Sequence, residues 1–174
     1  MAELPDGITL EDNRDLRGRS RRPWYRRGLL LCLVALPVLA LLNVFGQKPT
    51  SSVADGPAAG LAVTAPQRLR SGLIFQVRVE VVAHRDIHEP ELVFDRGWWE
   101  SMSVNSIQPE PSNESSQNSQ VALSYDKLDA GQKLVVWLYF QVNPTNVGKR
   151  RENVELDDGS TPLVHIHRSL TIFP

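Results

Sequence analysis

Cysteine is almost absent from this chain of 174 residues, which has only Cys32. A single thiol excludes an intramolecular disulfide and a zinc site built from cysteines. The chain also lacks an excess of positive charge, because 19 Lys and Arg residues face 20 Asp and Glu residues. A nucleic-acid-binding chain usually carries a clear basic excess, so we expect no nucleic-acid partner.

Motifs typical of enzymes are missing as well. The glycines stand singly, without a loop that could cradle a phosphate, and no serine lies in a G-x-S-x-G elbow. The many acidic residues lie in polar segments, where carboxylates are usually solvated. We therefore expect a protein that is not an enzyme, with no catalytic residue, no cofactor and no identified small-molecule substrate.

One long apolar run stands out near the N-terminus. Residues Gly28–Gln47 contain no charged side chain over 20 positions. Twenty helical residues extend about 30 Å, which matches the hydrocarbon thickness of a bilayer. The run has no polar face, so it predicts a transmembrane helix over 28–47 that carries the rest of the chain as a signal anchor. A cleaved export signal is the alternative, although no A-x-A site follows the run closely.

Charges that flank the run predict its orientation. Six arginines precede it without an intervening acid, whereas Lys48 is the only cation after it before Arg68. The positive-inside rule then places residues 1–27 in the cytoplasm and the C-terminal part outside the plasma membrane, crossed once. The same arginines set the topology or touch lipid headgroups: Arg17, Arg19, Arg21, Arg22, Arg26 and Arg27.

Composition changes again after the run. Residues 48–60 are rich in Pro, Ser, Gly and Ala, which predicts a flexible linker. Residues 61–174 then form the folded part. We expect strands over 61–63, 71–83, 92–94, 102–107, 121–125, 133–142, 153–156 and 162–173, with a polar loop over 108–119.

Alternation is clearest in two of these strands. In 71–83, Phe75, Val77, Val79 and Val81 share one face, and in 133–142 Leu134, Val136, Leu138, Phe140 and Val142 do the same. Seven or eight short strands separated by turn signals predict an all-β fold, an immunoglobulin-like antiparallel β-sandwich.

The strand FQVRVEVV (75–82) and the later LDAGQKLVVWLYFQV (128–142) resemble bacterial extracytoplasmic immunoglobulin-like modules of the conserved-repeat and CARDB-like kind. The resemblance covers about residues 60–174. It implies a membrane-anchored β-sandwich with a binding or scaffold role, and it carries over no functional residues.

Four histidines are candidates for a metal site. His165 and His167 fall on one face of a strand, while His84 and His88 flank a loop with acidic neighbours. Nothing in the sequence shows that the two segments meet, so we expect a surface histidine pair and no metal. A metal- or small-ligand-binding envelope sensor that uses His165 and His167 stays open as the alternative function.

Aromatic residues give the stronger hypothesis. Trp98 and Trp99 follow a polar Asp-Arg-Gly triplet, and Trp137 and Tyr139 lie on the face of 133–142 that a sandwich strand should leave polar. Either residues 95–119 cover that face, or it is an exposed aromatic patch. We expect all four residues to bind a membrane or envelope protein. The chain is then a non-catalytic interaction or accessory subunit of an envelope or membrane complex.

Overall fold

The computed structural model describes residues 22–42 and 47–174, which belong to two compact units. The first holds helix α1 (Arg22–Leu41), whose apolar side chains are exposed. Its segment Trp24–Leu41 is long and apolar enough to cross a membrane. Pro37 lies inside this helix. The second unit is a β domain.

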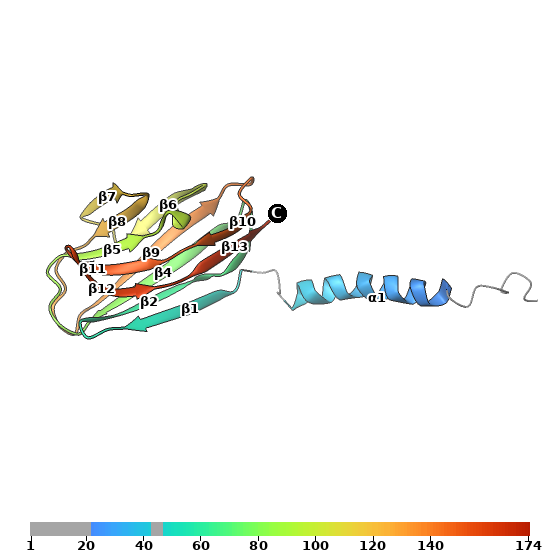
Figure 1. Ribbon diagram of the computed structural model, residues 1–174, viewed down its shortest axis with the longest axis horizontal. Coiled ribbons are helices and arrows are strands. Elements are labelled where there is room, and N and C mark those ends of the chain that lie inside the picture. Colours follow the sequence, from blue (N-terminus) through green and yellow to red (C-terminus); the bar gives the residue numbers. More distant parts are fainter. Residues whose placement is uncertain (1–21, 43–46) are drawn as a thin grey trace, which may run out of the picture. The chain divides into compact units, whose positions relative to one another are not determined.

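A five-stranded antiparallel sheet forms the first layer of the β domain, in the order β1-β2-β4-β9-β6 (Figure 1). The two longest strands, β4 and β9, pair at its centre, with Val77 opposite Leu138. The bounds of its strands are β1 Pro49–Asp55, β2 Ala59–Pro66, β4 Ile74–Ala83, β6 Met102–Gln108 and β9 Lys133–Val142.

The second layer consists of a five-stranded antiparallel sheet, β12-β11-β5-β8-β7, and a three-stranded sheet, β10-β13-β3. The backbone N–H of Glu152 donates to the carbonyl of Arg168 at 3.0 Å, so β10 and β13 continue the β11–β12 pair. The bounds are β3 Arg68–Arg70, β5 Pro90–Phe94, β7 Asn113–Gln117, β8 Gln120–Ser124, β10 Gly148–Arg151, β11 Val154–Asp158, β12 Thr161–Ile166 and β13 Ser169–Phe173.

Alternating side chains build the core between these layers. In β4 and β9 every second residue is buried, beginning at Phe75 and Val136, and the rings of Phe75 and Phe140 stack with centroids 5.5 Å apart. β5 and β11 supply the facing side chains, among them Phe94 and Leu156. The predicted fold class, an all-β antiparallel sandwich preceded by one apolar helix, is confirmed.

Most of the segment expected to be a linker is strand. Residues 49–55 form β1, and β2 over 59–66 lengthens the strand expected over 61–63, so the linker expected over 48–60 is wrong and the sandwich begins before residue 61. Thr50, Ser52 and Ala54 are partly buried on the inner side of β1, and the Thr50 hydroxyl donates to the carbonyl of Ala65 at 3.2 Å. Pairing with β2 therefore overrides the weak strand preference of the Pro-, Ser- and Ala-rich composition.

The loop expected over 108–119 also contains a strand, β7, which pairs with β8. The single strand expected over 162–173 is divided into β12 and β13 at His167 and Arg168. The break lets β13 pair with β10 and β3, while β12 pairs with β11.

Candidate functional site

Trp98 lies in a short 3-10 helix, η2 (Arg96–Trp98), that follows β5. Its side chain is 0% exposed, and its indole Nε1 donates to the carbonyl of Asn153 at 3.1 Å. The ring packs against Phe94 and Phe140, with centroids 5.9 Å and 5.7 Å away. Trp98 is thus a core residue, and the expectation that it binds a partner is wrong.

Trp99 is partly buried and packs against the same core. Its ring meets Phe94 edge-on at 5.9 Å and Phe140 at 5.5 Å. Both tryptophans turn inward because η2 lies tightly against β10: a Cβ on Gly97 would stand 1.7 Å from the carbonyl oxygen of Arg151. Only glycine permits this approach. Trp98 and Trp99 therefore do not form the exposed partner-binding pair that the sequence predicted.

Trp137 and Tyr139 lie on the outer side of β9, where both are half-buried. The Arg78 guanidinium carbon stands 5.5 Å from the centre of the Trp137 ring, and Gln76 Nε2 donates to the Tyr139 hydroxyl at 2.5 Å. Residues 95–119 do not cover this face as a lid. Their strand β6 extends the same sheet and pairs with β9 from the side.

Charged side chains border these aromatic rings. Glu80 forms ion pairs with Arg78 and with Lys133. The Lys133 ammonium, as hydrogen-bond donor, and Arg78 hold the pKa of Glu80 below its usual value, although partial burial opposes them. We name this surface the outer-sheet patch, and it consists of Gln76, Arg78, Glu80, Lys133, Val135, Trp137 and Tyr139.

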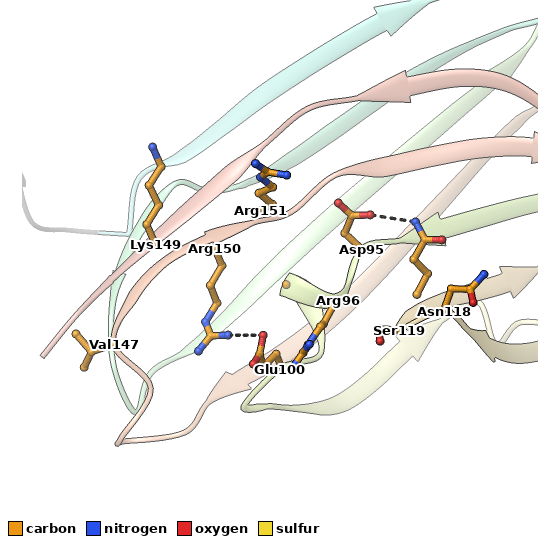
Figure 2. A pocket seen from close by; sticks show the side chains of 11 residues that line it. Asp95, Arg96, Glu100, Asn118, Ser119, Val147, Lys149, Arg150 and Arg151 are labelled. Atoms are coloured by element: carbon orange, nitrogen blue, oxygen red, sulfur yellow. Dashed lines mark hydrogen bonds and ion pairs between the residues drawn. The ribbon is translucent and has the colours of Figure 1, made fainter.

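An open pocket of about 650 Å³ lies between η2, the β7–β8 turn and β10 (Figure 2). Figure 2 shows the Arg150 side chain reaching Glu100, and the Nη1–Oε2 distance is 3.2 Å. Glu100 also pairs with Arg96 Nη2 at 3.1 Å. The residues that line the pocket include Asp95, Arg96, Glu100, Asn118, Ser119, Lys149, Arg150 and Arg151.

The carboxylates of this pocket are engaged by neighbouring side chains. Asp95 accepts hydrogen bonds from Asn153 Nδ2 at 2.7 Å and from Gln120 Nε2 at 3.1 Å. Glu100 is held by two arginines, as described above. Both carboxylates thus have hydrogen-bonding or ionic partners within the fold.

The rings of His165 and His167 lie side by side on exposed positions of the second layer, with centroids 4.2 Å apart. His165 Nδ1 is 3.6 Å from Glu155 Oε2, and His84 Nε2 is 3.5 Å from Asp55 Oδ1. Over residues 22–42 and 47–174, no group of three or more His, Cys, Asp or Glu side chains is arranged to hold a metal ion.

Two buried ionisable residues were not predicted from the sequence. Arg168 is almost fully buried and donates to three main-chain carbonyls of β1 and β2, at 2.7 Å for Ala65 and 3.0 Å for Thr50 and Val63. Its signal was the alternation itself: position 168 falls between Ile166 and Leu170 on the buried face.

Glu152 is the second buried ionisable residue, and it has no exposed surface. Burial raises the pKa of its carboxyl to about 8, while the nearby charges of Arg168 and Arg150 act in the opposite direction. It lies in the two-residue gap between β10 and β11. No periodic pattern covers this gap, so nothing in the sequence indicates that Glu152 is buried.

The predicted headgroup-contacting arginines divide into two groups. Arg26 and Arg27 are exposed on α1, and Arg22 is its first residue. Arg17, Arg19 and Arg21 lie outside the described residues.

Strand order, core and surface define the class: a β-sandwich domain that follows one apolar helix. No family model and no curated protein matches the chain. The resemblance to conserved-repeat and CARDB-like modules is therefore supported only as a shared type of β-sandwich.

Several solved structures have a similar arrangement of strands. A non-cellulosomal cohesin from the archaeon Archaeoglobus fulgidus is 15% identical, with 60% of this chain and 84% of that chain covered and a TM-score of 0.38. The third cohesin of ScaC from Acetivibrio cellulolyticus, solved with the ScaB dockerin, is 12% identical, with 60% and 92% covered and a TM-score of 0.39. An exo-β-N-acetylglucosaminidase from Vibrio harveyi is 11% identical, with 73% and 18% covered and a TM-score of 0.31.

Proposed function

We propose that this chain is a single-pass membrane protein whose extracytoplasmic β-sandwich binds another membrane or envelope protein. Helix α1 would be the anchor, with its N-terminal end on the cytoplasmic side and the sandwich outside. The arginine-rich flank before the helix supports this orientation. The length and apolar character of Trp24–Leu41 support the anchoring.

The outer-sheet patch is the observation that carries the binding role. Tryptophan, tyrosine and arginine dominate the energetics of protein interfaces, and the patch places Trp137, Tyr139 and Arg78 together on the two central strands. The sheet holds their backbones in register, so little conformational entropy is lost when a partner docks.

A non-catalytic role agrees with the pocket beside η2. Its two carboxylates, Asp95 and Glu100, are held by neighbouring side chains. We therefore propose binding rather than catalysis, with the anchor raising the local concentration of the domain near membrane-bound partners.

Site-specific photo-crosslinking in native membranes tests the binding role. A photoreactive phenylalanine analogue replaces Tyr139 in the patch or, as a matched half-buried control on the other layer, Glu155. We expect one discrete adduct from position 139 that is lost when Arg78→Ala is added, and none from position 155. Equal adducts from both faces, or none from position 139, would contradict the proposal.

Labelling in intact cells tests the orientation separately. A Cys32→Ser chain with Ser160→Cys places one thiol on an exposed turn of the sandwich. A membrane-impermeant maleimide should label it without cell lysis. Labelling only after lysis would place the sandwich in the cytoplasm.

A further inference from the structure

The chain enters the sandwich at one end, and four segments meet there. Gln47 Nε2 donates to the carbonyl of Ile74 at 3.3 Å, and the N–H of Ser71 donates to the carbonyl of Phe173 at 2.7 Å. β13 finishes at the same end at which β1 begins (Figure 1). We name this the tethered end, and it comprises residues 47–49, 67–74, 143–149 and 171–174.

Cations dominate the tethered end. Its four segments contain Lys48, Arg68, Arg70 and Lys149, all exposed, and no Asp or Glu. The neighbouring turn brings Glu100 close, since its main-chain carbonyl accepts from Asn146 Nδ2 at 3.4 Å, but this carboxylate is paired with Arg96 and Arg150. The Arg70 side chain already makes one hydrogen bond within the domain, since its Nε donates to the carbonyl of Pro174 at 3.2 Å.

Exposed apolar side chains lie among these cations. Leu73 is 41% exposed, Ile74 is 54% exposed and Val147 is 49% exposed. Leu73 precedes β4, Ile74 is the first residue of β4, and Val147 precedes β10. A turn in water is normally polar, so apolar turn residues beside cations indicate a surface that meets something other than water.

The opposite end of the sandwich has the reverse character. Main-chain bonds join its segments, with Ile87 bridging to Leu128 and the N–H of Gly159 donating to the carbonyl of Glu89 at 2.9 Å. Residues 55–59, 84–89, 126–132 and 157–161 hold seven acids against two cations, Arg85 and Lys127. We name this the far end.

Chain connectivity decides which end is held near the bilayer. The charge-free run ends at Gln47, and β1 begins at Pro49. Seven residues separate Leu41 of α1 from Pro49, and they span at most about 25 Å when extended. An anchored helix therefore keeps the tethered end close to the membrane surface, whatever the orientation of the domain.

We propose that the tethered end rests on the anionic phospholipid headgroups of the leaflet from which the helix emerges. This inference rests on the membrane anchoring proposed above. Lys48, Arg68 and Lys149 pair with phosphates, while the apolar turn residues enter the interfacial region. Such charges act within about 8–10 Å at physiological salt, a distance that the short connection permits. The acidic far end is held away from the headgroups by repulsion.

Energy transfer in nanodiscs tests the inference on the full chain. Cys32→Ser protein carries a donor dye at Thr145→Cys, on the tethered end, or at Ser160→Cys, on the far end, and both positions are exposed. The acceptor dye labels lipid headgroups. We expect transfer from position 145 to rise when phosphatidylglycerol replaces part of the phosphatidylcholine, and to fall back at high salt. Transfer from position 160 should not rise.

Charge reversal at each end supplies the matched comparison. Arg68→Glu should abolish the rise that depends on phosphatidylglycerol, and Arg85→Glu, an exposed cation of the far end, should leave it intact. Unchanged melting temperatures exclude misfolding. Chain that does not co-elute with nanodiscs would overturn the anchoring itself. Anchored chain whose transfer from position 145 ignores lipid charge would overturn only the headgroup contact.

Discussion

The interior of the sandwich and the outer-sheet patch use the same residue types in different surroundings. Inside, Trp98 is completely buried and Arg168 lies close to the carboxyl of Glu152. Outside, Trp137 lies beside Arg78, which pairs with Glu80. Burial raises the pKa of Glu152 to about 8, whereas cationic neighbours lower that of Glu80. Position relative to the sheets, rather than residue type, separates residues that hold the fold from residues free to bind.

The difference follows from desolvation. A buried charge loses its hydration and must recover it from nearby groups, as Arg168 does from the carbonyls of β1 and β2. A half-exposed charge keeps much of its hydration, so its ion pairs add little stability. Substitutions inside should therefore change folding, and those outside should change binding.

Removing the buried tryptophan should have the largest effect. Trp98→Ala leaves a large cavity between Phe94 and Phe140, and we expect a loss of about 3–5 kcal/mol in the free energy of unfolding. That is much of the stability of a small domain. Thermal unfolding followed by near-ultraviolet circular dichroism measures it. If the free energy of unfolding falls no more than in Trp137→Ala, the distinction between the core and the outer-sheet patch is wrong.

Arg168→Met should follow, with a loss of about 3 kcal/mol, because it removes the donor of several buried hydrogen bonds. It leaves the carbonyls of Thr50, Val63 and Ala65 without their guanidinium donor. Above about pH 8, where the carboxyl of Glu152 is ionised, the double variant with Glu152→Gln should recover part of the loss, since the uncompensated carboxylate is removed as well. Strictly additive losses in denaturant titrations would show that the two charges do not interact.

Glu152 should make stability depend on pH. Its pKa rises from 4.5 to about 8 on folding, so the folded chain keeps a proton that the unfolded chain releases. The free energy of unfolding therefore falls as pH rises through this interval, by at most about 1.4 kcal/mol per pH unit.

The measurement is best made between about pH 6.5 and 8. Burial raises the pKa of Asp157 only to about 6, so most of its contribution is already complete there. In this window Glu152→Gln should flatten the fall in stability. A Gln variant with the same slope as the parent chain would assign the dependence to another group.

Much of the fold could be predicted from the sequence, because β4 and β9 alternate cleanly and their period fixes which face is buried. β1 and β7 could not. Their Ser-, Asn- and Pro-containing sequences form strands only because β2 and β8 present partners to them. Pairing of this kind depends on residues distant in the chain.

The candidate site was predicted only in part, because the alternation of inward and outward side chains applies to strands and not to other elements. Trp137 and Tyr139 belong to a long strand, so counting by two placed them opposite the buried row. Trp98 and Trp99 belong to a 3-10 helix, where a period of two does not apply. Their polar neighbours suggested exposure, whereas the approach of Gly97 to β10 turns both rings inward.

Trp137→Ala gives the smallest expected change in stability and the most direct test of the outer face. Trp137 is half-buried, and its contact with Arg78 is worth about 0.5–1 kcal/mol at an exposed site. We therefore expect a loss of about 1 kcal/mol in the free energy of unfolding, together with loss of the adduct formed from position 139. Val53→Ala, an exposed position on the outer side of β1, is the matched control and should change neither property.

If Trp137→Ala keeps the adduct, the partner does not use the patch. If it destabilises the chain as much as Trp98→Ala, the outer tryptophan also holds the fold together, and tryptophan would then have the same role on both sides of the sheet.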